Sequence, residues 1–329
     1  MNTISDIVND NNFVKINGLG LNRLYMKIEA LNPAGSIKMK TALGMIRDLE
    51  LRGGIKSTTT LIESSSGSLG VALAIICAQR GYRFTCVVDP NTSVHNIKIM
   101  KALGAAVVII DKRDDNGGFL ASRIEYITEI VAHDPRYLWL NQYANPENPR
   151  AHAQTTAVSI FKNFDHVDYL FIGAGTTGTL MGCAEFFGQR SPRTKIIAVD
   201  TIGSVTFGHP AAKRYIPGIG TSRRPEIFSP DGIYAVEMVA ESATISMCRY
   251  LARSNGILAG GSTGTVLCAV QNWKGKIAPD ATVVTISPDF GERYLDTIYD
   301  DTWVRERFGN IPAMTTPEAM QNESALCGP

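Results

Sequence analysis

Short apolar runs alternate with stretches of helical periodicity along most of this sequence, and this alternation restricts the fold more than any other feature. In the first half, the apolar runs are residues 60–62, 84–88 and 106–110. In the second half, they are residues 169–172, 195–199 and 281–286. Helical patterns lie between these runs, at residues 69–80, before Gly104, and at residues 179–187, 241–254 and 264–273. Because parallel strands need a crossover connection, usually a helix, the pattern predicts an α/β fold of mostly parallel twisted sheets flanked by helices.

The length of the chain suits two such sheets. It has 329 residues, which is enough for about two domains. A Pro- and Asn-rich stretch at residues 145–149 separates the two groups of apolar runs and predicts a domain boundary. Residues 311–329 lose apolar periodicity, and we expect a loosely ordered tail there.

Charge and cysteine usage exclude several classes of protein. The 32 basic side chains nearly balance the 31 acidic ones, so no net field attracts nucleic acid or a membrane surface. The longest apolar run, residues 71–78, is far shorter than the ~20 residues that span a bilayer. The N-terminus lacks the features of a signal peptide, and the six cysteines form no C-x-x-C pair. We therefore expect a soluble, cytoplasmic protein with reduced cysteines and no metal site.

A glycine-rich turn follows the apolar run at residues 169–172. Residues 173–178 read G-x-G-x-x-G, and Asp200 ends the next apolar run, as in a dinucleotide-binding fingerprint. The turn itself requires only an anion, because exposed N–H groups at a helix N-terminus bind any phosphate. Its threonine hydroxyls suit a single phosphate group. At this point a nicotinamide cofactor, another phosphorylated cofactor and a simple structural turn remain open.

A second cradle of hydroxyls and amides follows the run at residues 60–62. Its sequence, Glu-Ser-Ser-Ser-Gly-Ser-Leu-Gly at residues 63–70, opens a helix and suits a carboxylate. Upstream, Lys38 stands in the first turn of a predicted helix, where the helix dipole disfavours a cation and lowers the pKa of an amine. Lys38 is therefore a candidate Schiff-base nucleophile, although its spacing alone favours a solvated surface lysine.

Four motifs together resemble the β-family, or fold type II, of pyridoxal-phosphate enzymes, which includes cysteine synthases and cystathionine β-synthases. They are Asn-Pro-Ala-Gly-Ser-Ile-Lys38 and residues 65–70, 175–179 and 260–264. The resemblance extends from about residue 13 to residue 303, and it displaces the dehydrogenase interpretation. It implies a fold like that of the tryptophan synthase β-subunit. Residues 1–12 and 35–145 would form an N-terminal α/β domain with a mobile subdomain, and residues 13–34 and 146–310 a C-terminal domain that binds the cofactor phosphate.

The same resemblance implies a role for each motif. Lys38 would bind pyridoxal 5'-phosphate as a Schiff base and then carry the α-proton, and Ser262 would face the pyridine nitrogen. A serine partner need not keep that nitrogen protonated, so β-elimination and replacement are expected rather than transamination. The phosphate would lie against Gly175, Thr176, Thr177, Gly178 and Thr179. The substrate carboxylate would lie against Ser65, Ser66, Gly67 and Leu69, with Gln142 assisting.

Ser68 departs from the family pattern. An asparagine usually stands at this position, and its amide contacts the phenolic oxygen of the cofactor. With the shorter serine, that contact would be lost, lengthened or bridged by water. A catalytically silent, cofactor-bound regulator is therefore one hypothesis for this chain.

Within the family, the chain is most similar to the branch that makes N-(2-amino-2-carboxyethyl)-L-glutamate, a precursor of 2,3-diaminopropionate in siderophore biosynthesis. The similar stretches are residues 86–90, 141–145, 217–223, 291–296 and 301–303. This implies that O-phospho-L-serine loses phosphate and that the amino group of L-glutamate replaces it. Both reactants are anionic, so cations are needed. Arg123, Tyr143 and Arg223 are the implied substrate residues.

Two other expectations complete this interpretation. A cysteine synthase that uses sulfide with O-acetylserine or O-phosphoserine is the alternative activity, and such synthases usually carry an apolar residue where Arg223 stands. Family likeness also implies a homodimer that acts on small amino acids.

Overall fold

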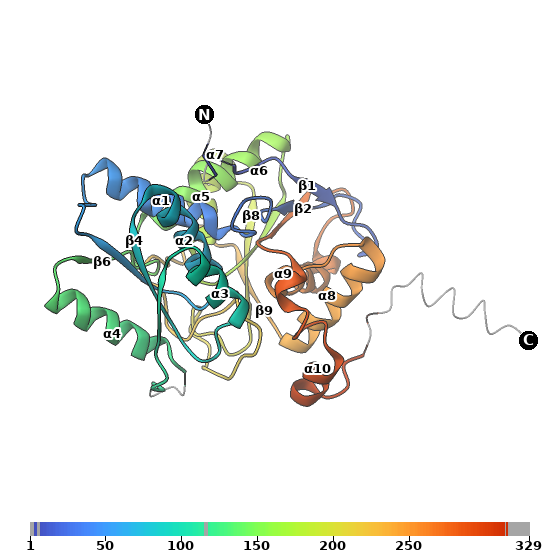
Figure 1. Ribbon diagram of the computed structural model, residues 1–329. Coiled ribbons are helices and arrows are strands. Elements are labelled where there is room, and N and C mark those ends of the chain that lie inside the picture. The colour runs from blue at the N-terminus through green and yellow to red at the C-terminus, as the bar shows by residue number, and fades with distance from the viewer. Residues whose placement is uncertain (1–2, 5–6, 115–117, 313, 315–329) are drawn as a thin grey trace, which may run out of the picture.

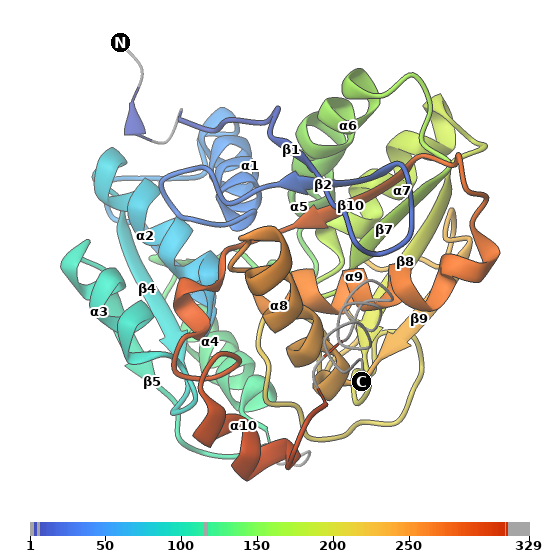
Figure 2. The same ribbon diagram turned by 90° about the vertical axis from the view of Figure 1, so that its right-hand side faces the viewer.

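The computed structural model describes residues 3–4, 7–114, 118–312 and 314, which fold around two sheets (Figure 1). The larger sheet is parallel except for the antiparallel pair β1–β2 at its edge. Its six strands, in the order β1–β2–β10–β7–β8–β9, span Phe13–Lys15, Leu24–Ile28, Val283–Ser287, Tyr169–Gly173, Lys195–Thr201 and Ala235–Val239. Figure 2 shows β2 and β10 side by side, although they come from opposite ends of the chain.

Both faces of the larger sheet are covered by helices because its strands are apolar on both sides. On β7, Leu170 and Ile172 pack toward α7, whereas Phe171 packs toward α9. The helices on the first face are α5 (Glu147–His152), the π-helical turn η2 (Ala153–Ala157), α6 (Val158–Asn163) and α7 (Gly178–Arg190). Those on the second face are α8 (Glu241–Asn255) and α9 (Gly261–Trp273).

The smaller sheet has four parallel strands in the order β5–β4–β3–β6, which span Ala106–Ile109, Arg83–Val88, Thr60–Ser64 and Tyr137–Trp139. Its helices are α1 (Lys38–Leu51), α2 (Ser68–Arg80), α3 (Val94–Ala102) and α4 (Leu120–His133). Leu61 of β3 contributes to the core beneath α1 and α2, and Ile62 to a smaller cluster beneath α4. The remaining short elements are η3 (Lys274–Lys276), η4 (Gly291–Tyr294) and α10 (Asp301–Phe308).

The predicted α/β class is confirmed, and the six apolar runs all appear as strands within one or two residues of their expected positions. Gly81 ends α2 in the left-handed conformation, with φ of 69°. The sequence pattern missed β1, β2, β6 and β9 because they are short or carry charged residues.

Within the first 34 residues, β1 and β2 pair in the larger sheet, whereas α1 packs on α2 over the smaller one. The full domain division stays a prediction. The expected loose tail, residues 311–329, falls almost entirely outside the described residues. None of the helices in the described part of the chain has the length and apolar character that crossing a bilayer requires.

Candidate active site

Lys38 is the first residue of α1, and the chain before it is fixed to the loop that follows β10. The N–H of Ile37 donates to the carbonyl of Pro288 over 2.8 Å, and Ser36 forms a β-bridge with Asp289. Burial lowers the pKa of Lys38 to about 8, and the negative charge of Asp289 opposes this shift. Near pH 8, Lys38 is therefore neutral in a large fraction of the protein molecules, as a nucleophilic amine requires.

Asp289 is a buried carboxyl beside Lys38 that the sequence analysis missed. Burial raises its pKa to about 6, while a 2.7 Å hydrogen bond from the Tyr294 hydroxyl to Oδ2 acts in the opposite direction. Its Oδ1 has no hydrogen-bond partner among the described residues, and a Cβ on Gly260 would overlap it. The only sequence signal for Asp289 is its position just after β10, where parallel sheets place ligand groups.

The glycine-rich turn connects β7 to α7, as predicted. Thr177 adopts the left-handed conformation with φ of 66°, and its buried Oγ1 has no partner within the described part of the chain. Thr176 accepts a 3.3 Å hydrogen bond from the Asn148 amide. Gly175 lies so close to the next loop that a Cβ there would be 3.3 Å from the carbonyl oxygen of Gly218. Together with the N–H groups at the start of α7, Gly178 and Thr179, this turn fits one phosphate group.

Asp200 does not complete a dinucleotide site. It is fully buried at the end of β8, and its Oδ1 accepts a 2.8 Å hydrogen bond from the N–H of Thr201. Burial raises its pKa to about 6. Because this carboxyl is buried, the structure does not support the ribose contact on which the dinucleotide interpretation depended.

The predicted carboxylate cradle forms the turn between β3 and α2. The buried hydroxyl of Ser65 accepts hydrogen bonds from the N–H groups of Gly67, over 3.4 Å, and Gly70, over 2.9 Å. The Leu69 side chain packs in the core, so only its backbone N–H remains for a ligand, whereas Ser66 and Gly67 are half-buried. The Gln142 amide donates to the carbonyl of Ser64 over 3.1 Å, which fixes Gln142 beside this turn.

Ser68 begins α2 and contacts an arginine from the other end of the chain. Arg293 donates to the Ser68 hydroxyl over 2.9 Å and to the carbonyl of Ala34 over 2.6 Å. The arginine accepts no hydrogen bond, so the Ser68 proton stays available for another acceptor. Ser262 is buried at the start of α9, two residues after the glycine that touches Asp289.

Arg123, Tyr143 and Arg223 lie in one neighbourhood. Arg123 is buried on α4, and its Nε lies 3.5 Å from a carboxylate oxygen of Asp89; its Nη1 has no hydrogen-bond partner among the residues described. The Arg223 guanidinium carbon lies 5.7 Å from the centroid of the Tyr143 ring. Burial raises the pKa of Tyr143, and the positive charges of both arginines oppose that shift. The two arginines thus form a cationic group around Tyr143, which follows Gln142 in the chain; Asp89 faces Arg123 and Glu226 pairs with Arg223.

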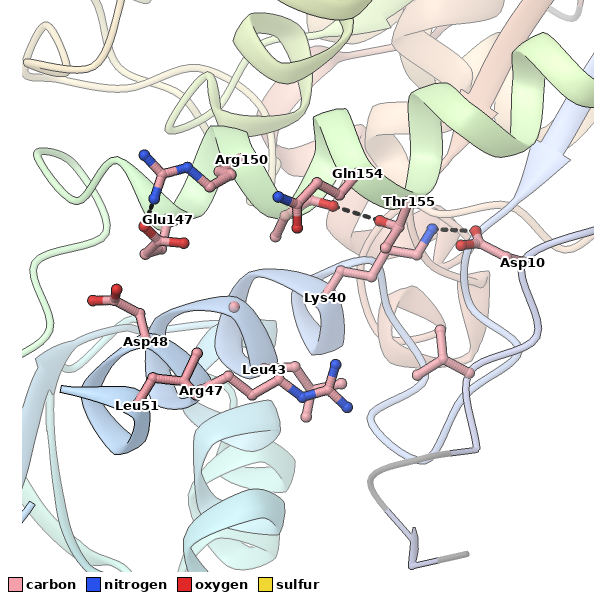
Figure 3. A pocket seen from close by; sticks show the side chains of 13 residues that line it. Asp10, Lys40, Leu43, Arg47, Asp48, Leu51, Glu147, Arg150, Gln154 and Thr155 are labelled. Carbon is pink, nitrogen blue, oxygen red and sulfur yellow. Dashed lines mark hydrogen bonds and ion pairs between the residues drawn. The ribbon is translucent and has the colours of Figure 1, made fainter. Parts of the chain in front are cut away.

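A buried ion network anchors α1 behind Lys38. Lys40 pairs with Glu29 over 2.7 Å and with Asp10, and it donates to Thr156 over 3.0 Å. Figure 3 shows Lys40 and Asp10 at the edge of a cavity of about 570 Å³ between α1 and α5. None of the predicted cofactor or substrate residues lines this cavity. The described residues contain no group of three or more His, Cys, Asp or Glu side chains that could bind a metal ion.

A family model described as "pyridoxal-phosphate dependent enzyme" matches residues 4–289. The chain belongs to this family. Two relatives are both named N-(2-amino-2-carboxyethyl)-L-glutamate synthase. The one from Ralstonia nicotianae is 41% identical over 282 residues, which cover 85% of this chain and 83% of the relative. The one from Cupriavidus metallidurans is 38% identical over 302 residues, which cover 89% of each chain.

Solved structures of the same family have the same fold. A hydrogen sulfide-producing enzyme from Fusobacterium nucleatum is 30% identical with a TM-score of 0.83, covering 90% of this chain and 100% of its own. The O-acetylserine-dependent cystathionine beta-synthase from Helicobacter pylori is 29% identical with a TM-score of 0.84, covering 91% and 99%. The protein is therefore a pyridoxal-phosphate-dependent enzyme of the β-replacement class, and the predicted fold type II is confirmed.

Proposed function

We propose that this enzyme replaces the phosphate of O-phospho-L-serine with the amino group of L-glutamate to give N-(2-amino-2-carboxyethyl)-L-glutamate. The cationic group of Arg123 and Arg223 around Tyr143 is the observation that carries the proposal. The leaving group is a phosphate dianion, and the incoming amino acid has two carboxylates, so both reactants need such cations. The names of the two relatives support the same substrates.

Pyridoxal 5'-phosphate fits the residues around Lys38. The Thr177 hydroxyl, which is buried without a partner among the described residues, and the N–H groups at the start of α7 would hold its phosphate. Ser262 would face its ring nitrogen, and Ser68 its phenolic oxygen. The bound cofactor would supply an electron sink for the charge that forms when the substrate loses its α-proton.

The chain's own side chains would then bind the substrate and move its proton. Lys38 Nζ would take the α-proton and return it, which suits an amine whose pKa burial lowers to about 8. N–H groups from Ser66 to Leu69 would hold the substrate carboxylate at the N-terminus of α2, with Gln142 beside them. Arg123, Tyr143 and Arg223 would hold the remaining anionic groups.

A cysteine synthase that uses sulfide is the second candidate activity. The similarity to a hydrogen sulfide-producing enzyme favours it. Hydrogen sulfide has no carboxylate, so this activity with O-acetylserine as donor leaves the charge of Arg223 without a role. A cofactor-bound regulator, prompted by Ser68, is the candidate from another class.

Competition between acceptors tests the three candidates. The purified protein is incubated with O-phosphoserine and equal concentrations of glutamate, sulfide and other amines, and the products are identified by mass spectrometry. We expect the glutamate adduct to dominate. Cysteine as the main product would favour the sulfide-using synthase, and no product with either phosphoserine or O-acetylserine would favour the regulator.

Lys38 is tested by the absorbance of its Schiff base. The wild type is expected to be yellow, and Lys38→Ala is expected to lose the visible band. A colourless wild type after incubation with the cofactor would refute the cofactor assignment. We further propose that the enzyme is a homodimer in the cytoplasm, and light scattering coupled to size exclusion measures its mass in solution.

A further inference from the structure

The loop that carries Arg223 is fixed to the phosphate-binding turn. The N–H of Gly220 donates to the carbonyl of Ala174 over 2.8 Å, directly before Gly175. The Thr221 hydroxyl then donates to the carbonyl of Arg223 over 2.9 Å and accepts from its N–H over 3.2 Å. The backbone of Arg223 is therefore held in place, and only its side chain is free to adapt.

The Arg223 side chain reaches from this loop toward the carboxylate-binding turn. Its guanidinium lies over the ring of Tyr143, which directly follows Gln142 in the chain. The amide of Gln142 bonds the carbonyl of Ser64 at the start of that turn. Arg223 thus connects the loop bonded to the phosphate-binding turn with Tyr143, the chain neighbour of the Gln142 that bonds the carboxylate-binding turn.

The partner of Arg223 is weakly held. Its guanidinium pairs with Glu226, and the two side chains are 32% and 46% exposed. Exposed pairs of this kind contribute little, because water solvates both charges well. The pair between Arg123 and Asp89, in contrast, is 9% and 8% exposed. A carboxylate from solution can therefore replace Glu226 at Arg223 far more easily than it can replace Asp89 at Arg123.

We propose that Arg223 selects a dicarboxylic amino acid as the second substrate by binding its side-chain carboxylate, and that Glu226 occupies Arg223 until this substrate displaces it. The inference rests on the proposed function and adds the residue that distinguishes glutamate from glutamine, its analogue with an uncharged side chain. A carboxylate bound by a guanidinium through two parallel hydrogen bonds is recognised by charge and shape together, which glutamine cannot match.

The test compares glutamate with glutamine as acceptor for the holoenzyme and three variants. In Arg223→Met, we expect kcat/KM for glutamate relative to glutamine to fall at least tenfold, through a higher KM for glutamate. In Glu226→Gln, we expect KM for glutamate to fall about threefold, because the competing carboxylate is gone. Arg224→Met is the matched control: Arg224 is the neighbouring exposed arginine, it lies over Phe228 instead, and its loss should leave the selectivity unchanged.

A structural role for Arg223 would lower the rates with both acceptors equally, and this result would overturn the inference. So would an Arg223→Met variant that keeps the wild-type preference for glutamate. A wild-type enzyme that releases no phosphate from O-phosphoserine with either acceptor overturns the proposed function itself. A wild type that prefers glutamate, but whose Arg223→Met variant keeps that preference, overturns the role of Arg223 alone.

Discussion

Gly182 lies where α7, the helix that carries the phosphate-binding turn, packs against α5 and η2. A Cβ at Gly182 would overlap the carbonyl oxygen of Pro149 and lie 2.7 Å from the backbone nitrogen of Ala153. Both neighbours are backbone atoms, so no side chain can rotate away to make room. Gly182→Ala must therefore push two packed helices apart.

The expected magnitude follows from two opposing effects. Overpacking of this kind costs about 1–3 kcal/mol, whereas replacing glycine by alanine inside a helix gains ~1 kcal/mol. Since the overlapping atoms are backbone, we expect the cost at the upper end and a net loss of about 2 kcal/mol in the free energy of unfolding. Gly188 in the same helix is exposed, and a Cβ there meets no described atom within 4 Å. Gly188→Ala should therefore gain about 0.5–1 kcal/mol.

Urea unfolding of cofactor-free protein, followed by circular dichroism, measures both variants without the stabilisation that a bound cofactor adds. Because α7 begins at the phosphate-binding turn, Gly182→Ala should also bind the cofactor more weakly than Gly188→Ala. Equal stabilities of the two variants, within about 0.5 kcal/mol, would refute the argument from packing.

Two further predictions concern the surroundings of Lys38. The rate at which cofactor-free enzyme combines with pyridoxal phosphate should rise with pH, with a midpoint at about 8, where Lys38 loses its proton. Asp289→Asn should move this midpoint to lower pH because the negative charge of Asp289 raises the pKa of Lys38. Stopped-flow absorbance measures the midpoint, and an upward or absent shift would contradict the assignment. Lys40→Met should cost about 3 kcal/mol of stability because it leaves the buried carboxylate of Glu29 poorly compensated. Lys112→Met, at an exposed lysine, is the control. Equal losses in the free energy of unfolding, measured in urea, would refute the role of burial.

The fold could be predicted because its strands are apolar on both faces and its helices fall regularly between them. The same reasoning could not find β2, since this strand carries Lys27, which a sequence pattern interprets as a surface residue. Lys27 is instead fully buried beside Glu29, 3.6 Å from a carboxylate oxygen, and it donates to Ser159 over 3.0 Å. Glu29 is close in the sequence, but Ser159 and Asp10, whose carboxylate lies 3.0 Å from Lys27, come from distant parts of the chain. Only the folded structure therefore provides the partners that allow this charge to be buried.

The candidate site was predictable where a single segment makes it. The turns at residues 65–70 and 175–179 each combine glycine, hydroxyls and a helix start within a few positions, so their spacing indicates an anion. Asp289 could not be predicted in this way, because what distinguishes it is its proximity to Lys38 and Gly260, which lie in separate parts of the chain. For Leu69, the motif predicts a place in the carboxylate cradle, and packing directs the side chain into the core.

Ser68 belongs to a sequence motif and also contacts Arg293, which is distant in the chain. This contact gives a specific expectation for a variant with the asparagine that is usual in the family. Arg293 donates to the Ser68 oxygen, which leaves one hydroxyl proton to reach the phenolic oxygen of the cofactor. The shorter serine makes this contact at long range or through water, whereas in Ser68→Asn the amide oxygen can accept from Arg293 while the longer amide nitrogen donates directly to the cofactor. Affinity should therefore rise by up to about one hydrogen bond, roughly fivefold. Ser68→Ala removes both contacts and should bind more weakly than the wild type. Fluorescence titration of cofactor-free enzyme orders the three proteins, and an asparagine variant that binds no better than the alanine variant would show that position 68 does not contact the cofactor.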